Sequence, residues 1–162
     1  MSDIEIRRAD AADAERLHAA LCQLSTDLND THMASLDDML RHGFSGEPAF
    51  FALLAIRKSD DRTVGALLAS PVFSTTRGGA GLYVSDLWVD SHVRGAGLGQ
   101  RLLAAAVDLA PENWSVTFVK LAVYHDNPDA QRFYERLGFK PRKDETVFDL
   151  MGPELENLRK RP

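Results

Sequence analysis

Two neighbouring segments, Asp86-Leu-Trp-Val-Asp90 and Arg94-Gly-Ala-Gly-Leu-Gly99, decide the fold. The first ends an apolar, strand-like run that begins at Gly81, and the apolar spacing from Gly97 to Ala110 is typical of a helix. Three glycines at alternate positions between a strand and a helix bring several backbone N–H groups together at the positive end of the helix. Side chains there would hinder both positive φ angles and the close approach of a diphosphate. The sequence therefore predicts an anion-binding turn.

Two other phosphate-binding patterns do not fit this turn. The dinucleotide fingerprint needs a third glycine at its sixth position, but counting from Gly95 leads to Gln100 and counting from Gly97 leads to Leu102. The P-loop pattern fails because no Gly-Lys-Ser/Thr follows. A glycine-rich turn without any ligand remains an alternative, although Arg94 and the strand-to-helix context favour a ligand.

Hydrophobic spacing and turn residues predict the elements on either side of this turn. The expected strands are Ile4–Arg7, Phe50–Ile56, Val64–Ala69, Gly81–Val89, Val116–Tyr124 and Thr146–Leu150. The expected helices are one that follows Asp10 and carries Leu17, Leu21, Leu24 and Leu28, then Ser35–Gly43, Gly97–Ala110, Asn127–Gly138 and a short one from Pro153. The order βααβββαβαβ predicts a mixed α/β fold with a central sheet.

Length and composition bound the kind of protein. With 162 residues, 44% of them hydrophobic, the chain suits a single domain over residues 1–162. A formal net charge of −5 disfavours nucleic-acid binding, and we expect no membrane span. The beginning of the sequence lacks a signal-peptide pattern, so a cytoplasmic location is expected.

The sequence provides no reason to expect a bound metal. Cys22 is the only cysteine, which excludes an internal disulfide and a site with several thiolates. Cys22 also lacks any feature that would activate its thiol, so an acetyl-cysteine intermediate is disfavoured. The five histidines show no obvious ligand spacing: His18, His32, His42, His92 and His125.

Arg94-Gly-Ala-Gly-Leu-Gly99 resembles the R-x-x-G-x-G signature of the GNAT family of N-acetyltransferases. The resemblance continues in Asp86–Asp90 before it and in Asn127–Phe139 after it. It implies a mostly antiparallel sheet with helices on both faces, acetyl-CoA as cosubstrate and, by analogy with many members, a homodimer. It also implies cofactor contacts from Leu87, Trp88, Val89, Arg94, Gly95, Ala96, Gly97, Leu98, Gly99, Gln100, Asn127 and Tyr134.

The resemblance assigns the chemistry to two residues. Tyr134 matches the tyrosine that protonates the departing sulfur, and a phenol with a pKa near ~10 can donate to a thiolate whose acid has a pKa around ~8.5. The alternative is that Tyr134 belongs to an apolar helix face with Phe133 and Leu137. Asp86, a carboxylate in an apolar strand, is either the base that deprotonates the amine or a buried structural acid. His125 is the second candidate for the base.

The sequence says less about the acceptor than about the donor. Arg41–Phe51 is similar to the diamine or spermidine/spermine N-acetyltransferase branch, which often carries an acidic pair at the positions of Ser85 and Asp86. Only Asp86 is acidic in this chain, which weakens a polyamine assignment. Further candidate contacts for a cationic amine are Ser85, Asp27, Asp30 and Glu145. We expect Asp27 and Asp30 on the loop between the first two helices.

Three hypotheses follow. The first is transfer of acetyl from acetyl-CoA to a primary amine of a small molecule, such as a diamine, polyamine or amino-acid-like compound, by direct attack in a ternary complex. The second is a non-catalytic acyl-CoA sensor with the same fold. The third is a peptide or protein N-acetyltransferase.

Overall fold

The computed structural model describes residues 3–160. The chain divides into two compact units, one up to Ala122 and one from Val123 onwards. The first contains the sheet and most of the predicted cofactor contacts. The second contains Asn127 and Tyr134. Within residues 3–160, no helix is both long and apolar enough to cross a membrane.

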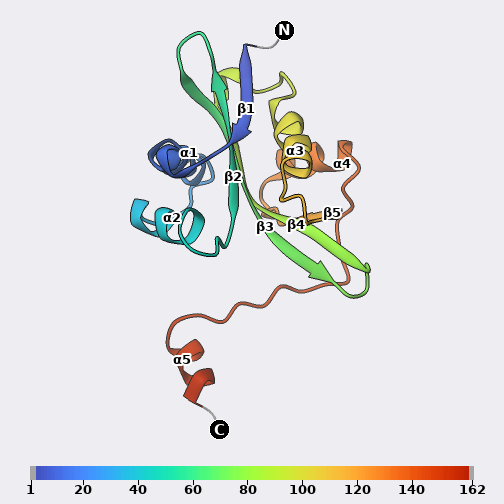
Figure 1. Ribbon diagram of the computed structural model, residues 1–162. Coiled ribbons are helices and arrows are strands. Elements are labelled where there is room, and N and C mark those ends of the chain that lie inside the picture. The colour runs from blue at the N-terminus through green and yellow to red at the C-terminus, as the bar shows by residue number, and fades with distance from the viewer. Residues whose placement is uncertain (1–2, 161–162) are drawn as a thin grey trace. The chain divides into compact units, whose positions relative to one another are not determined.

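The first unit is built on a five-stranded sheet in the order β1-β2-β3-β4-β5 (Figure 1). The first three strand pairs are antiparallel, and only β4 and β5 run parallel. A parallel neighbour requires a crossover, which a helix between β4 and β5 supplies. The strands are β1 (Ile4–Arg8), β2 (Phe51–Arg57), β3 (Arg62–Ser74), β4 (Gly79–Val89) and β5 (Val116–Leu121).

Helices cover both faces of this sheet, as predicted. On one side α1 (Ala14–Asp27) packs on β3 and β4, and α2 (Leu36–Gly43) packs on α1. On the other side, visible in Figure 1, α3 (Leu98–Asp108) contacts β2, β3 and β4. Two short 3-10 turns, η1 (Ala11–Asp13) and η2 (Ser91–Val93), precede α1 and α3.

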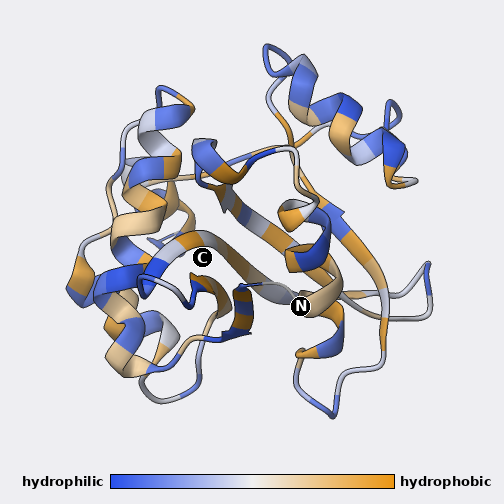
Figure 2. Cartoon of the chain, turned by 90° about the horizontal axis from the view of Figure 1, so that it is seen from above, coloured by the Kyte–Doolittle hydropathy of each residue, from blue (hydrophilic) through white to orange (hydrophobic). Residues whose placement is uncertain are grey.

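The central strands are buried on both faces, which explains why their sequences are apolar without alternation. On the α1 side, Leu17 and Leu21 pack in one cluster with Leu54 and Trp88. On the other side α3 lies so close that a Cβ added to Gly65 would approach Leu102 Cδ1 to 3.0 Å. In Figure 2 the helices show mixed hydrophobic and hydrophilic colours along their length, as expected for elements with one buried face.

Two helix starts follow the predicted capping chemistry. Ser35 Oγ accepts a hydrogen bond from Asp38 N–H at 3.1 Å, and Ser35 N–H donates to the Asp38 carboxylate at 2.9 Å, which completes a capping box. Asp10 caps η1, and α1 follows it directly from Ala14. Both helices therefore begin where the sequence predicts.

Strand β3 is longer than the predicted Val64–Ala69. It continues through Pro71 to Ser74, although proline disfavours central strands. Pairing with β2 ends at Ala69, so beyond that point β4 is the only neighbour of β3 among the described residues. Pro71 therefore lies in what is locally an edge, where a missing N–H is tolerated.

The second unit corrects one predicted strand. It contains α4 (Pro128–Arg136) and α5 (Gly152–Lys160), but residues 146–150 form no strand. Val147 is 81% exposed and Phe148 is 90% exposed. Strand propensity alone does not form a ladder, because each strand needs a neighbour to bond its N–H and C=O groups. The last β of the predicted order is therefore wrong, whereas the helix predicted from Pro153 is confirmed.

An ion pair between β1 and η1 fixes the beginning of the first unit. Arg7 donates to both carboxylate oxygens of Asp13 at 2.6 and 2.7 Å, and Asp10 N–H donates to the same carboxylate at 3.0 Å. The Asp13 side chain is 8% exposed, whereas that of Arg7 is 39% exposed. These bonds, that from Arg7 above all, lower the pKa of Asp13 from 3.8 to about 2.

We expect Asp13→Asn to lower the free energy of unfolding by about 1–3 kcal/mol at pH 7, because Arg7 loses its partner while it retains some solvation. Since the pKa of Asp13 is lowered on folding, its contribution is complete above about pH 4 and is lost as the pH falls towards 2. Urea unfolding at several pH values measures the difference. Asp61→Asn, which removes an exposed partner of Arg16, is the control and should lower the free energy of unfolding much less than Asp13→Asn. Equal losses in the two variants would contradict the prediction.

Candidate functional site

A buried carboxylate holds the turn between β4 and the segment Arg94–Gln100, called the glycine loop. One oxygen of Asp90 accepts a hydrogen bond from His92 N–H at 2.9 Å, and His92 Nδ1 lies 2.9 Å from the same atom. The other oxygen accepts a hydrogen bond from Arg62 at 3.1 Å. These bonds, first that from His92 N–H, hold the pKa of Asp90 below its ordinary value. Asp90 therefore stays charged and fixes the geometry of η2.

The glycine loop has the backbone that the sequence predicts. Gly95 has φ +83° and Gly97 has φ +76°, values that residues with a Cβ rarely adopt. A Cβ added at either glycine would meet no atom within 4 Å, so the space above the loop is open to a ligand. The first hydrogen bond of α3 runs from Arg101 N–H to Gly97 C=O, and the N–H groups of residues 98–100 precede it. This geometry fits a diphosphate bound by backbone N–H groups at a helix N-terminus.

The strand before the loop offers an open edge. Pairing between β4 and β5 ends at Val84 and Leu121, so among residues 3–160 the rest of β4 pairs only with β3. The register of β4 against β3 shifts at Ser85, which stands opposite no residue of β3 and forms a bulge. The backbone groups of Leu87–Val89 that face away from β3 therefore have no strand neighbour among the described residues, and one of them, Val89 C=O, accepts a hydrogen bond from Arg94 Nε at 2.9 Å. The side chain of Trp88 packs in the core and its backbone pairs with Ala66 of β3, so its predicted cofactor contact has no support in this geometry.

Asp86 lies half-buried beside this bulge. Its carboxylate accepts a hydrogen bond from Ser85 Oγ at 2.8 Å. Burial raises the pKa of Asp86, and the Ser85 hydroxyl and the nearby His32 only partly oppose that effect. A carboxylate with a raised pKa can accept a proton more readily than an exposed one, as a general base requires. The geometry is compatible with that role, which stays a prediction.

Asp27 is placed differently from the prediction. It is the last residue of α1, outside the following loop, and its carboxylate accepts hydrogen bonds from Arg94 at 2.7 Å and from Trp88 Nε1 at 3.3 Å. Arg94 Nε also donates to Val89 C=O at 2.9 Å. Asp27 thus connects α1 to the glycine loop. Any further contact between Asp27 and an amine stays a prediction.

In the second unit, Asn127 and Tyr134 lie at opposite ends of α4. Asn127 Oδ1 accepts a hydrogen bond from Ala130 N–H at 3.2 Å, which confirms the predicted helix cap. Tyr134 makes edge-to-face contacts with Phe133 and Phe139 at centroid distances of 5.0 and 5.4 Å. Burial raises the pKa of Tyr134 to about 12, so the phenol keeps its proton at neutral pH. This state is the one that a proton donor needs.

The other predicted residues have less structural support. Glu145 is exposed and lies 3.5 Å from Arg142, and His125 is exposed before α4. Asp30 is on the exposed loop after α1. The first unit brings together Ser85, Asp86, Leu87–Val89, Arg94–Gln100 and Asp27, whereas Asn127, Tyr134, His125 and Glu145 belong to the second unit.

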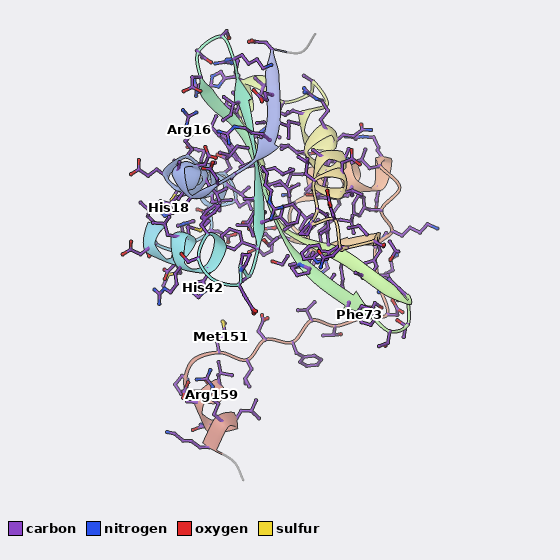
Figure 3. All side chains as sticks on the ribbon, in the orientation of Figure 1. Arg16, His18, His42, Phe73, Met151 and Arg159 are labelled. Atoms are coloured by element: carbon purple, nitrogen blue, oxygen red, sulfur yellow. The ribbon has the colours of Figure 1, made fainter. Side chains whose placement is uncertain are left out.

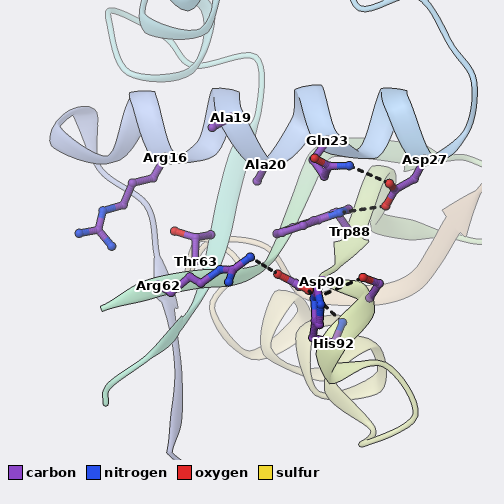
Figure 4. A pocket seen from close by; sticks show the side chains of 11 residues that line it. Arg16, Ala19, Ala20, Gln23, Asp27, Arg62, Thr63, Trp88, Asp90 and His92 are labelled. Carbon is purple, nitrogen blue, oxygen red and sulfur yellow. Dashed lines mark hydrogen bonds and ion pairs between the residues drawn. The ribbon is translucent and has the colours of Figure 1, made fainter. Parts of the chain in front are cut away.

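A pocket of about 520 Å³ opens between α1, the start of β3 and the end of β4 (Figure 4). Its lining includes Arg16 and Gln23 from α1, Arg62 from β3, Trp88 from β4 and His92 from η2. None of Gly95–Gln100 lines it, so it lies beside the glycine loop and does not coincide with it. Arg16 and Arg62 were not predicted as pocket residues, because they are far apart in the sequence and only the fold brings them together.

Comparisons with known proteins agree on one family. The model of the acetyltransferase (GNAT) family matches residues 15–139. A peptidyl-lysine N-acetyltransferase, YjaB from Escherichia coli, is 30% identical over 155 residues, which cover 93% of this chain and 91% of that protein. A probable spermine N(1)-acetyltransferase from Bacillus subtilis subsp. natto is 29% identical over 59 residues, 36% of this chain and 39% of that protein.

The fold has a solved counterpart as well. The integron cassette protein VCH_CASS6 from the mobile metagenome of V. cholerae matches with a TM-score of 0.81 at 23% identity, over 99% of this chain and all of that one. A family model that spans most of the chain and a relative that is similar over nearly its whole length lead to one conclusion: the chain belongs to the acetyltransferase (GNAT) family of acetyl-CoA-dependent acyltransferases.

Proposed function

We propose that the chain, acting as one domain over residues 1–162, transfers acetyl from acetyl-CoA to a primary alkylamine by direct attack in a ternary complex. The observation that carries this proposal is the open glycine loop that follows an edge of β4 without a neighbour among residues 3–160, with the half-buried Asp86 on the same strand. Acetyl-CoA supplies the thioester. The protein binds and orients the cosubstrate and transfers the protons.

Backbone groups provide most of the donor site in this proposal. The N–H groups of the glycine loop bind the pyrophosphate, while outward backbone groups of the segment Leu87–Val89 pair with the pantetheine, and an N–H there polarises the thioester carbonyl. Asn127 adds a hydrogen bond to the cofactor. Such donors are fixed by the fold before the reaction, so no reorganisation is needed when negative charge develops on the carbonyl oxygen.

Two side chains move the protons. Asp86, directly or through water, takes a proton from the ammonium so that the neutral nitrogen attacks the thioester carbon. The new C–N bond forms, the C–S bond breaks, and Tyr134 donates its proton to the departing thiolate. The raised pKa of Asp86 suits acceptance of a proton, and the raised pKa of Tyr134 keeps its phenol protonated at neutral pH. His125 is the alternative base.

The acceptor has two candidates. A lysine side chain of a peptide is favoured by the similarity to the E. coli peptidyl-lysine acetyltransferase, because this similarity covers more than nine-tenths of both chains. A free diamine, polyamine or amino-acid-like amine is supported by the shorter similarity to a probable spermine acetyltransferase. Both present a primary alkylamine to the same base. A homodimeric state and a cytoplasmic location remain predictions.

An acceptor panel separates these candidates. Release of the CoA thiol is measured with lysine-containing peptides, with matched peptides in which acetyl-lysine replaces lysine, and with free diamines, spermidine and spermine. We expect turnover on the lysine peptides and none on the acetylated ones. Turnover restricted to free amines would reverse the choice of acceptor, and cofactor binding without turnover on any amine would support an acyl-CoA sensor.

We expect Tyr134→Phe to lower kcat by about 10- to 1,000-fold, the scale of a lost general acid, with a smaller effect on cofactor affinity. Tyr124→Phe is the matched control, since it removes a phenolic hydroxyl from an exposed side chain of the same unit. Steady-state kinetics at saturating acetyl-CoA measure both variants. Unchanged turnover in Tyr134→Phe would remove the phenol from the mechanism.

We expect Gly97→Val to weaken acetyl-CoA binding by about tenfold or more, because the side chain strains a positive φ and occupies the space above the loop. Gly78→Val is the control: it imposes a similar strain at φ +70° in the turn between β3 and β4, which is remote in sequence from the glycine loop. Calorimetric titration with CoA compares the two. Equal affinities would show that the loop does not bind the cofactor.

A further inference from the structure

Three side chains with metal-binding chemistry meet where α1 faces the loop that follows it. His18 and Cys22 stand on successive turns of α1, four residues apart, and His32 comes from the loop 28–35. One donor atom from each of the three lies within 4.8 Å of the other two. Cys22 Sγ is 3.7 Å from His18 Nε2. All three side chains are partly buried and belong to the first unit.

The second observation is an unused lone pair on His32. Within the described part of the chain, His32 Nε2 is buried and has no hydrogen-bond partner. The other ring nitrogen, Nδ1, lies 3.1 Å from Ser25 Oγ. When Nδ1–H donates to Ser25, Nε2 is left as a buried acceptor without a donor, which costs about 1–3 kcal/mol. A metal-ligating histidine usually donates its other ring N–H to an oxygen acceptor, and Ser25 Oγ stands in that place here.

The spacing suits a tetrahedral ion. Zinc bonds of roughly 2.0–2.1 Å to nitrogen and 2.3 Å to sulfur place such donors about 3.3–3.7 Å apart. Cys22 Sγ and His18 Nε2 already have this separation, and a donor atom of His32 lies within 4.8 Å of the donor atoms of both. The competing interactions are the hydrogen bond between His18 Nε2 and Ala34 C=O at 3.0 Å and the edge-to-face packing of the two rings at 5.2 Å. Metal binding would replace the first of these.

We propose that His18, Cys22 and His32 bind one Zn²⁺ ion, with water as the fourth ligand, and that this ion ties the loop 28–35 to α1. Two imidazoles and a thiolate suit zinc, whereas Mg²⁺ and Ca²⁺ prefer oxygen ligands. The loop has no helix or strand from residue 30 to 34, and Met33 is 84% exposed. A metal bond to His32 would therefore fix residues 30–34 to α1, although no helix or strand hydrogen bonds hold this segment. The site goes beyond the proposed acetyl transfer and does not depend on it.

Cobalt titration of the metal-free full-length chain tests this site. Because Cys22 is the only cysteine, a thiolate-to-cobalt absorption band can arise only from it. We expect the band to saturate at one Co²⁺ per chain, to disappear when Zn²⁺ is added, and to be absent in Cys22→Ser. His18→Ala and His32→Ala should each lower the affinity by about tenfold or more. Absence of the band in the unaltered chain would overturn the proposal.

Control variants separate metal binding from folding. His42 lies on α2 and is not part of the cluster; Figure 3 labels both His42 and His18. His42→Ala should leave the affinity unchanged. Circular dichroism and urea midpoints of the metal-free variants check that each is folded. In hydrogen exchange of the unaltered chain, Zn²⁺ should slow the amides of residues 28–35. Unchanged exchange in this loop, or equal Co²⁺ affinity in His32→Ala and His42→Ala, would leave the cluster as a packed histidine pair and overturn the proposal.

Discussion

The early end of the pairing between β4 and β5 is the constraint on which the candidate site depends. Up to Val84 the two strands share a parallel ladder, and beyond it β4 keeps only β3 as a neighbour among the described residues. The bulge at Ser85 lies at that point and adds local twist, which favours separation of the strands. A longer ladder would have paired the outward backbone groups of Leu87–Val89 with β5. Because the ladder stops, that edge of β4 is the part of the core strand to which we assign the donor in the proposed function.

Much of the first unit follows from its sequence because local and long-range signals agree there. Apolar runs predicted the hairpin of β2 and β3, Ser35 and Asp38 predicted a helix start, and glycines predicted the positive φ angles before α3. The segment 146–150 failed because strand formation depends on a neighbouring strand, which residue propensity does not describe. The pocket around Arg16 and Arg62 was not predicted either, because its residues are distant in the sequence and meet only in the folded chain.

The sequence predicted the part of the candidate site that the backbone forms. It predicted less well which side chains contact one another there. Glycine spacing located the loop, but no pattern showed that Asp27 would bond Arg94 and Trp88. His18 and Cys22 are four residues apart in the sequence, but two side chains do not indicate a metal site. The cluster is recognised only when the fold brings His32 close to them. The resemblance to a family supplied the role of Tyr134, and the structure adds the physical reason that its proton is held.

The hydrogen bonds of Arg94 have a thermodynamic consequence. Its guanidinium bonds Val89 C=O on one side and the Asp27 carboxylate on the other, so both ends of the turn are held before any ligand arrives. A loop that is ordered in advance loses little conformational entropy when it binds, and a larger share of each N–H bond appears as affinity. In the proposed function, the ion pair between α1 and the loop would therefore add to affinity through rigidity, besides any contact that Arg94 itself makes.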